Sequence, residues 1–429
     1  MNFKIRSLIL SIFILTWIPA HAQESLSLSL ALEKALQNNY GIILSTADTE
    51  IAAINNSWGT AGRIPTVGFT ASSNNSYELT DNTTSNRIAL GLGMNWTLFD
   101  GFRVNITKHK LEDLQELSEG ARAVVVENTI EDVILYYYNV LLQQERLKVL
   151  EKVMKLSEDR YNYEMQRYNL GGSVTYNVLQ AKNLYLSDKA SFMNQEVVVR
   201  NSIRDLNFVL GEEPSATWDF IETFDIDTEE YELGDLQAKM LSNNQTLQNQ
   251  YINLKLMQKE VALQKSDYYP TIRLGAGIEN SYSRMTQETG DPITSSSLSP
   301  YGNLSLSFDI YDAGNRASDV RIARINEEMA GVEIEQMEHS LTNLLLNVYD
   351  YYTVRLALLE VAMENLEAAE LNLQIADEKF KTGAINSFNY RDIQLIYLNA
   401  ALGRLQAVYN LVDSKTVLTR LTGGFLQDY

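Results

Sequence analysis

The chain has 429 residues, of which 35 are Lys or Arg and 55 are Asp or Glu, so its formal net charge is −20. An acidic chain without a basic block argues against a nucleic-acid or anionic membrane-surface partner. The chain has no Cys, which excludes disulfides and thiolate metal sites, and its three His argue against histidine-rich metal chemistry.

The first 22 residues have the pattern of a signal peptide. Lys4 and Arg6 precede an apolar run from Leu8 to Ile18, and Ala20 and Ala22 are small residues at the two positions that a signal peptidase reads. The run is too short to cross a bilayer as a helix, which needs about 20 residues. We expect residues 1–22 to be removed and the mature protein to be exported without a transmembrane helix.

The rest of the sequence contains two copies of one unit. Pro65–Tyr77 recurs as Pro270–Tyr282 at an offset of 205, whereas Asp100 and all later matches recur at an offset of 212. The offset changes once, in a Ser/Thr-rich stretch at 283–300 that we interpret as a surface loop. The predicted divisions are a first repeat over 23–211, an acidic linker over 212–235 and a second repeat over 236–429.

Alternating residues predict two strands in each copy. From Ile88 to Leu98 the even positions are apolar, and the odd positions are small or polar. Such alternation over about 10 residues is typical of a membrane-spanning strand around a watery lumen. The predicted strands lie at about 64–77, 86–98, 270–283 and 300–311.

Aromatic residues gather near both ends of these strands, as they do at the two interfaces of a lipid-facing barrel. They are Trp96, Phe99, Phe102, Tyr268, Tyr269 and Tyr311 towards the helices, and Tyr77, Tyr282 and Tyr301 towards the loops. Two hairpins cannot close a barrel, because their edges would stay unpaired in lipid. We therefore expect copies of the chain to associate through their strands.

Long helices are predicted where apolar residues recur every seven positions. The positions are Val133, Val140, Leu147, Met154, Tyr161 and Tyr168 in the first copy, and Leu345, Tyr352, Leu359, Leu366, Leu373 and Phe380 in the second. A sustained seven-residue repeat predicts left-handed coiled coils. A helix from Arg103 to Tyr168 would be about 100 Å long. An ordinary soluble coiled coil would explain these repeats but not the strands.

Two segments join a predicted strand to a long helix: LFDGFR at 98–103 and IYDAGNR at 310–316. Together with the duplicated plan, they resemble the strand-to-helix signature of the outer-membrane efflux protein (TolC-like) family, and the resemblance covers essentially the whole mature chain. Asp100 and Asp312 can cap the helices that follow, while Gly101 and Gly314 permit sharp turns. Structural capping is the role that we favour for these residues.

The resemblance implies a mostly α fold with a small β part, built from a duplicated helix, β-hairpin, long helix and helix. It implies a homotrimer in which a twelve-stranded outer-membrane β-barrel continues into a twelve-helix coiled-coil tunnel in the periplasm. The acidic linker would then form a belt around the tunnel.

The implied function is passive exit of substrates from an inner-membrane transporter and a periplasmic adaptor (membrane fusion) protein, in tripartite efflux or type I secretion. The alternative is a periplasmic coiled-coil scaffold or interaction protein without pore activity. We find no nucleophile-elbow, P-loop or dinucleotide motif, and His109 and His339 lie in no metal-ligand spacing. We therefore predict no enzymatic activity, cofactor or metal.

The resemblance also implies two groups of site residues. The turns between helices would contact the adaptor through Leu170, Gly171, Gly172, Thr382, Gly383 and Ala384, although Gly171 and Gly383 are more simply helix C-caps. A gate would be formed by Asn389 and Asp392, which lie three residues apart on one helix face. In a trimer Asp392 would form a ring of carboxylates that attracts cations; the alternative is a solvated helix residue without a gating role.

Overall fold

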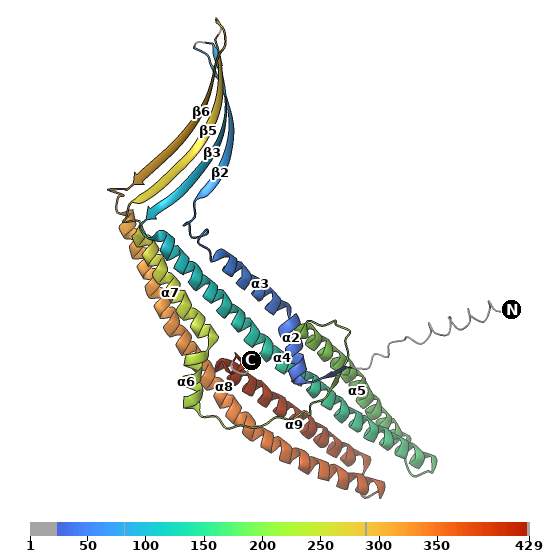
Figure 1. Cartoon of the computed structure of the whole chain (residues 1–429). Helices are drawn as coiled ribbons and strands as arrows, with labels where there is room; N and C mark the ends of the chain where they lie inside the picture. The colour runs from blue at the N-terminus through green and yellow to red at the C-terminus, as the bar shows by residue number, and fades with distance from the viewer. Residues whose placement is uncertain (1–23, 81, 288–289, 427–429) are drawn as a thin grey trace, which may run out of the picture. The chain divides into compact units, whose positions relative to one another are not determined.

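The computed structural model describes residues 24–80, 82–287 and 290–426, so the predicted signal peptide at 1–22 lies outside the described residues (Figure 1). The elements in chain order are β1 (Glu24–Leu26), α2 (Leu28–Asn38), α3 (Tyr40–Asn55), β2 (Thr66–Glu78), β3 (Thr83–Asp100), α4 (Arg103–Asn169), α5 (Thr175–Leu210), β4 (Trp218–Phe220), α6 (Leu233–Asn243), α7 (Gln245–Ser266), β5 (Thr271–Thr286), β6 (Ile293–Ser307), α8 (Asn315–Lys381), α9 (Ser387–Leu421) and the 3₁₀ helix η1 (Gly424–Leu426). Within the described ranges, no helix is both long and apolar enough to cross a membrane.

The order of elements repeats. A pair of helices, a β-hairpin, a 67-residue helix and a shorter helix occur first as α2 to α5 and again as α6 to α9. The helix pair is broken by an Asn in both copies. Asn39 Oδ1 accepts a hydrogen bond from the Gly41 amide at 2.8 Å, and Asn244 Oδ1 accepts one from the Leu247 amide at 3.1 Å. An Asn that satisfies the free amides of a new helix starts that helix afresh.

The chain forms two compact units, and each takes segments from both copies. Of the described residues, the helical unit contains those up to Ile43, Val125–Met240 and those from Asn343 onward. The sheet unit contains Leu44–Val124 and Leu241–Thr342.

In the sheet unit, β2, β3, β5 and β6 form one antiparallel sheet in that order, and they lie side by side in Figure 1. Their register places the predicted apolar residues in rows across the strands. One row is Phe69, Leu92, Ile278 and Pro300, and another is Ala71, Leu90, Asn280 and Leu298. Because side chains alternate along a strand, these rows share one surface, which we call the apolar face. The opposite, polar face carries rows such as Thr66, Asn95, Gly275 and Asn303.

The second hairpin differs from the prediction. β5 continues to Thr286 and β6 runs from Ile293 to Ser307, so most of the predicted loop at 283–300 is strand and the predicted strand at 300–311 begins and ends too late. Ser and Thr lack the apolar alternation that marked the other strands, but their backbones pair equally well. Ser281 and Ser297 are partners in the ladder and hydrogen-bond through their hydroxyls at 3.1 Å.

This longer hairpin also corrects the predicted place of one aromatic residue. Tyr301 pairs with Gly277 in the middle of the strand and lies on the polar face, not in a girdle near the loop. At the other end of the sheet the aromatics do gather. Phe99, Phe102 and Tyr269 pack edge to face, with ring centroids 5.4 to 6.5 Å apart.

In the helical unit, the two long helices each return as a hairpin, α4 with α5 and α8 with α9 (Figure 1). The seven-residue pattern describes α8 well, because Leu345, Tyr352, Leu359, Leu373 and Phe380 are buried. In the last part of α4 the pattern shifts, since Val153 is buried and Tyr168 is exposed. Val153 belongs to a buried cluster with residues of α8 and α9, such as Leu373 and Tyr397. A second neighbour therefore decides which face of α4 is buried there.

The acidic linker is more structured than its composition suggests. Its short strand β4 pairs in parallel with β1. Tyrosines of both copies hold the linker: Tyr137 donates to Glu222, and Tyr352 donates to the Glu229 carbonyl at 2.6 Å. Lys415 pairs with the Glu229 carboxylate at 2.8 Å.

Candidate functional site

The strand-to-helix turns have the same backbone shape in both copies. Gly101 and Phe102 have φ of 68° and 70°, and Ala313 and Gly314 have φ of 57° and 85°. Two successive residues in the left-handed region reverse the chain sharply before the helix begins. A Cβ on Gly101 would lie 2.3 Å from the Ser266 carbonyl oxygen, so only Gly fits there.

The two aspartates of these turns cap their helices with different completeness. Asp312 accepts from the Gly314 amide at 3.0 Å, the Arg316 amide at 2.7 Å and Arg316 Nε at 2.9 Å. The hydrogen bond from the Arg316 backbone amide is the main reason why the pKa of Asp312 is lowered. Among the described residues, Asp100 accepts a hydrogen bond only from the Val104 amide, at 3.4 Å. Both carboxylates therefore accept a backbone amide at the start of the following helix, at a short distance for Asp312 and at a long one for Asp100.

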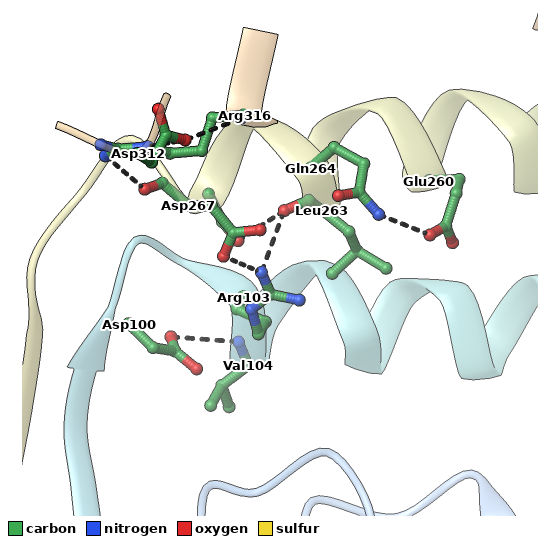
Figure 2. Close-up of polar contacts among 10 residues, drawn as sticks. Asp100, Arg103, Val104, Glu260, Leu263, Gln264, Asp267, Asp312 and Arg316 are labelled. Carbon is green, nitrogen blue, oxygen red and sulfur yellow. Dashed lines mark hydrogen bonds and ion pairs between the residues drawn. The ribbon is translucent and has the colours of Figure 1, made fainter. Parts of the chain in front are cut away.

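Two arginines join both turns to the end of α7, as Figure 2 shows. Arg103 pairs with the Asp267 carboxylate and donates to the Leu263 carbonyl at 3.3 Å, while Arg316 donates to the Asp267 carbonyl at 3.2 Å. The sequence predicts roles only for the Asp and Gly residues of these turns. The signal that could have found the two arginines is an Arg at the end of both motifs. One polar cavity of 240 Å³ is lined by the aspartate and the arginine of both turns: Asp100, Arg103, Asp312 and Arg316.

The predicted tip residues are exposed, and the two tips close in the same way. The Gly172 amide donates to the Arg167 carbonyl at 2.7 Å, and the Ala384 amide donates to the Lys379 carbonyl at 2.8 Å. Gly171 and Gly383 have φ of 78° and 76°, which completes a Schellman-type C-cap in each copy. Leu170 is 87% exposed, and Thr382 is exposed as well. The turns thus offer compact, uncovered surfaces.

The predicted gate residues lie just after the second tip. Asn386 caps α9 by accepting hydrogen bonds from the Phe388 and Asn389 amides at 3.0 and 2.8 Å. Asn389 and Asp392 are both exposed, whereas Tyr390 and Gln394 on the other side of the helix are buried. The structure therefore brings Asn389 and Asp392 onto one uncovered face of α9.

A buried polar network lies close to this face and was not predicted from the sequence. Arg391 donates to both oxygens of Asp188, at 2.6 and 2.9 Å, and to Ser157 at 3.3 Å. The network joins α4 and α5 of the first copy to α9 of the second. Charged helix residues resemble solvated surface residues in a sequence, so no periodic signal could have found this contact. In the described part of the chain, no group of three or more His, Cys, Asp or Glu residues is placed to hold a metal.

Solved structures share this fold. CusC matches with a TM-score of 0.76 and 17% identity, over 92% of this chain and 92% of that one. The outer-membrane channel OprN matches with a TM-score of 0.74 and 18% identity, over 92% and 90% of the two chains. The Campylobacter jejuni outer membrane channel CmeC gives a TM-score of 0.74 and 16% identity, over 92% and 85%. No curated protein matches the chain.

The family comparison covers most of the sequence. The family model described as outer membrane efflux protein matches residues 31–212 and 236–424, one segment in each copy. The strand-to-helix turns, the tips and both β-hairpins all lie within the matched segments. The chain therefore belongs to the outer membrane efflux protein family.

Proposed function

We propose that three copies of the chain close one twelve-stranded barrel in the outer membrane and continue as a periplasmic helical tunnel, through which substrates leave passively. The observation that carries this proposal is the sheet: one face carries rows of mostly apolar side chains, yet in the described residues β2 and β6 each pair on one side only. Open edges are not tolerated in lipid, so neighbouring copies must pair with them. The family supplies the number three.

The helices support association as well. On α5 the apolar residues Leu179, Leu186 and Met193 recur at steps of seven and are exposed in the single chain. A stripe of this period is the seam of a coiled coil. A neighbouring copy would cover it, and the tunnel would be built by the same association that closes the barrel.

Two measurements test the channel. Full-length protein purified in mild detergent should have the mass of a trimer, and it should conduct ions across a planar lipid bilayer. A monomer or dimer would contradict the proposal that three copies close one barrel. A stable trimer without conductance would favour the alternative, a periplasmic scaffold without pore activity.

The tips are where we place the periplasmic adaptor, and through it the inner-membrane transporter. Because the chain has no Cys, a single Cys at Leu170 or Thr382 can be cross-linked specifically in cells. Both variants should capture the adaptor. Asn194→Cys is the matched control, because it is exposed on α5 away from the tip; equal capture there would show that the tips are not the contact.

The gate is the third part of the proposal. With threefold symmetry the exposed Asp392 becomes a ring of carboxylates, which attracts cations and repels anions. Hexaamminecobalt(III) added from the periplasmic side should block the parent pore, and Asp392→Ala should remove the block. Glu378→Ala is the control, because Glu378 is an exposed carboxylate on the other helix of the same hairpin. If the Asp392 variant is blocked as well as the parent, Asp392 does not line the gate.

A further inference from the structure

A cavity of 400 Å³ lies between the two helical hairpins, near the second tip. α4 contributes Arg160 and Tyr163 to its lining, α8 contributes Phe380, and α9 contributes Tyr390. The volume is in the range of sites for small molecules. Because α4 belongs to the first copy and α8 and α9 to the second, anything bound here touches both hairpins.

Arg160 carries a buried charge near the carboxylates of Asp188 and Glu164. Its side chain is 2% exposed, and within the described ranges it makes no ion pair. Its Nη1 donates to the Ser387 carbonyl at 3.3 Å, and its Nε has no hydrogen-bond partner. Burial lowers the pKa of Arg160 to about 10, so the guanidinium stays charged at neutral pH. A buried cation in this condition is costly unless an anion pairs with it.

Three of the nearby carboxylates are engaged by other groups, while Asp159, which also lines the cavity, is exposed and makes no ion pair with Arg160 in the described part of the chain. Asp188 is held by Arg391 at 2.6 and 2.9 Å, and Glu164 accepts from the Ser173 hydroxyl at 2.7 Å. In the cavity itself, Asp377 pairs with Lys381 at 2.6 Å and accepts from the Tyr390 hydroxyl at 3.0 Å. None of these carboxylates forms an ion pair with Arg160 in the described part of the chain, so an anion from outside the chain can supply that pair.

The remaining wall is aromatic. Phe380 and Tyr390 are stacked, with ring centroids 4.8 Å apart and 9° between the planes, and Tyr163 lies 5.2 Å from Phe380. Flat rings of this kind favour an aromatic ligand over an inorganic anion.

We propose that this cavity binds a small aromatic monocarboxylate, with its carboxylate on Arg160 and its ring against Phe380 and Tyr163. The carboxylate and the buried guanidinium form a charge-assisted pair. Bound ligand stabilises the contact between the two hairpins, because it binds only where both are present. The inference lies beyond the channel function and does not depend on it.

The test uses 4-fluorobenzoate and full-length protein in an uncharged detergent, followed by fluorine NMR. The parent should show saturable binding, and Arg160→Met should weaken it at least tenfold. Arg146→Met is the matched control: Arg146 lies on the same helix, is partly buried and donates to Gln406 at 2.6 Å, but it does not line the cavity. Its affinity for 4-fluorobenzoate should equal that of the parent.

A second ligand tests, on the parent protein alone, whether the site prefers a negative charge. 4-Fluorobenzylamine has a similar size and the opposite charge, so it should bind at least tenfold more weakly than 4-fluorobenzoate. Equal binding of the amine, unchanged binding in Arg160→Met or no saturable binding of 4-fluorobenzoate would each overturn the proposal. If 4-fluorobenzoate does not bind while a photo-cross-linker at Tyr163 captures the adaptor, a partner's side chain fills the cavity instead.

Discussion

The hairpins α4–α5 and α8–α9 come from equivalent parts of the two copies, yet the side chains that they bury differ in polarity. In α8, Ala369 and Ala376 are buried. The equivalent residues of α4, at the offset of 212, are Ser157 and Glu164, and both are buried too. Small apolar residues let helices approach closely, whereas buried polar residues require partners.

The partners are also present in one copy only. Asp188 has Ala400 as its counterpart, and Arg391 has Leu179. The network of Arg391, Asp188 and Ser157 therefore exists only because the two copies have diverged. The two copies therefore share their helical frame, whereas the polar residues at the contact between them are not shared.

The largest expected effect comes from breaking this network. Asp188→Ala leaves Arg391 buried without a carboxylate, which should lower the free energy of unfolding by about 3–5 kcal/mol. The double variant Asp188→Ala, Arg391→Leu installs the residues of the other copy at both positions, and it should recover most of the loss. Thermal unfolding followed by circular dichroism in detergent measures both. A double variant as unstable as the single one would mean that packing, not charge, is lost.

The lipid-facing surface should respond equally in the two copies, because both share its alternation. Leu92 and its counterpart Leu304 lie on the apolar face. Leu92→Arg and Leu304→Arg should each destabilise the assembled barrel by roughly 2–4 kcal/mol per copy, seen as loss of the heat-resistant oligomer on gels. Asn95→Ser and Ser305→Ala, on the polar face, are the controls. Tolerance of Arg in one copy alone would show that its hairpin does not face lipid.

Much of the fold of both copies could be predicted from the sequence. Periods of two and seven reveal which residues share a face, so the apolar rows around Leu92 and the seam around Leu359 followed directly. The polar contacts did not, because Arg391 and Asp188 lie 203 residues apart and each looks like a solvated helix residue. The start of β6 was missed for another reason: Ser and Thr pair through their backbones without a period that marks the strand.

A third difference between the copies should appear in the pH dependence of stability. Glu127 is 4% exposed and its Oε1 has no hydrogen-bond partner among the described residues, whereas its counterpart His339 is exposed. Burial raises the pKa of Glu127 from 4.5 to about 7, and Arg420 opposes this only partly. Because the folded state holds the proton more tightly than the unfolded chain, the free energy of unfolding should fall as pH rises from about 4.5 to 7.

Glu127→Gln removes this titration and keeps the shape of the side chain. The variant should match the parent near pH 4.5 and exceed its stability at pH 8, by at most about 3 kcal/mol. Chemical unfolding at the two pH values measures the difference. A parent that is more stable than the variant at pH 8 would show that the carboxylate is charged and paired.

The smallest effect concerns the strand-to-helix turns, where the same backbone carries different residues. Ala313 has a φ of 57° next to Gly314, whereas Phe102 has a φ of 70° next to Gly101. A residue with a Cβ costs about 1–2 kcal/mol in this region, while Gly adds freedom to the unfolded chain. Ala313→Gly should therefore raise the free energy of unfolding by about 0.5 kcal/mol.

Phe102→Gly relieves the same strain but should destabilise the protein, because the ring packs edge to face on Phe99 and Tyr269 at 5.4 and 6.1 Å. Such ring pairs contribute about 0.5–1.5 kcal/mol each beyond the area that they bury. Opposite signs for the two substitutions, measured by thermal unfolding, would show that the first copy tolerates its strained residue because of aromatic packing. If both substitutions stabilise the protein, the aromatic cluster does not hold the turn, and backbone strain alone distinguishes the two copies here.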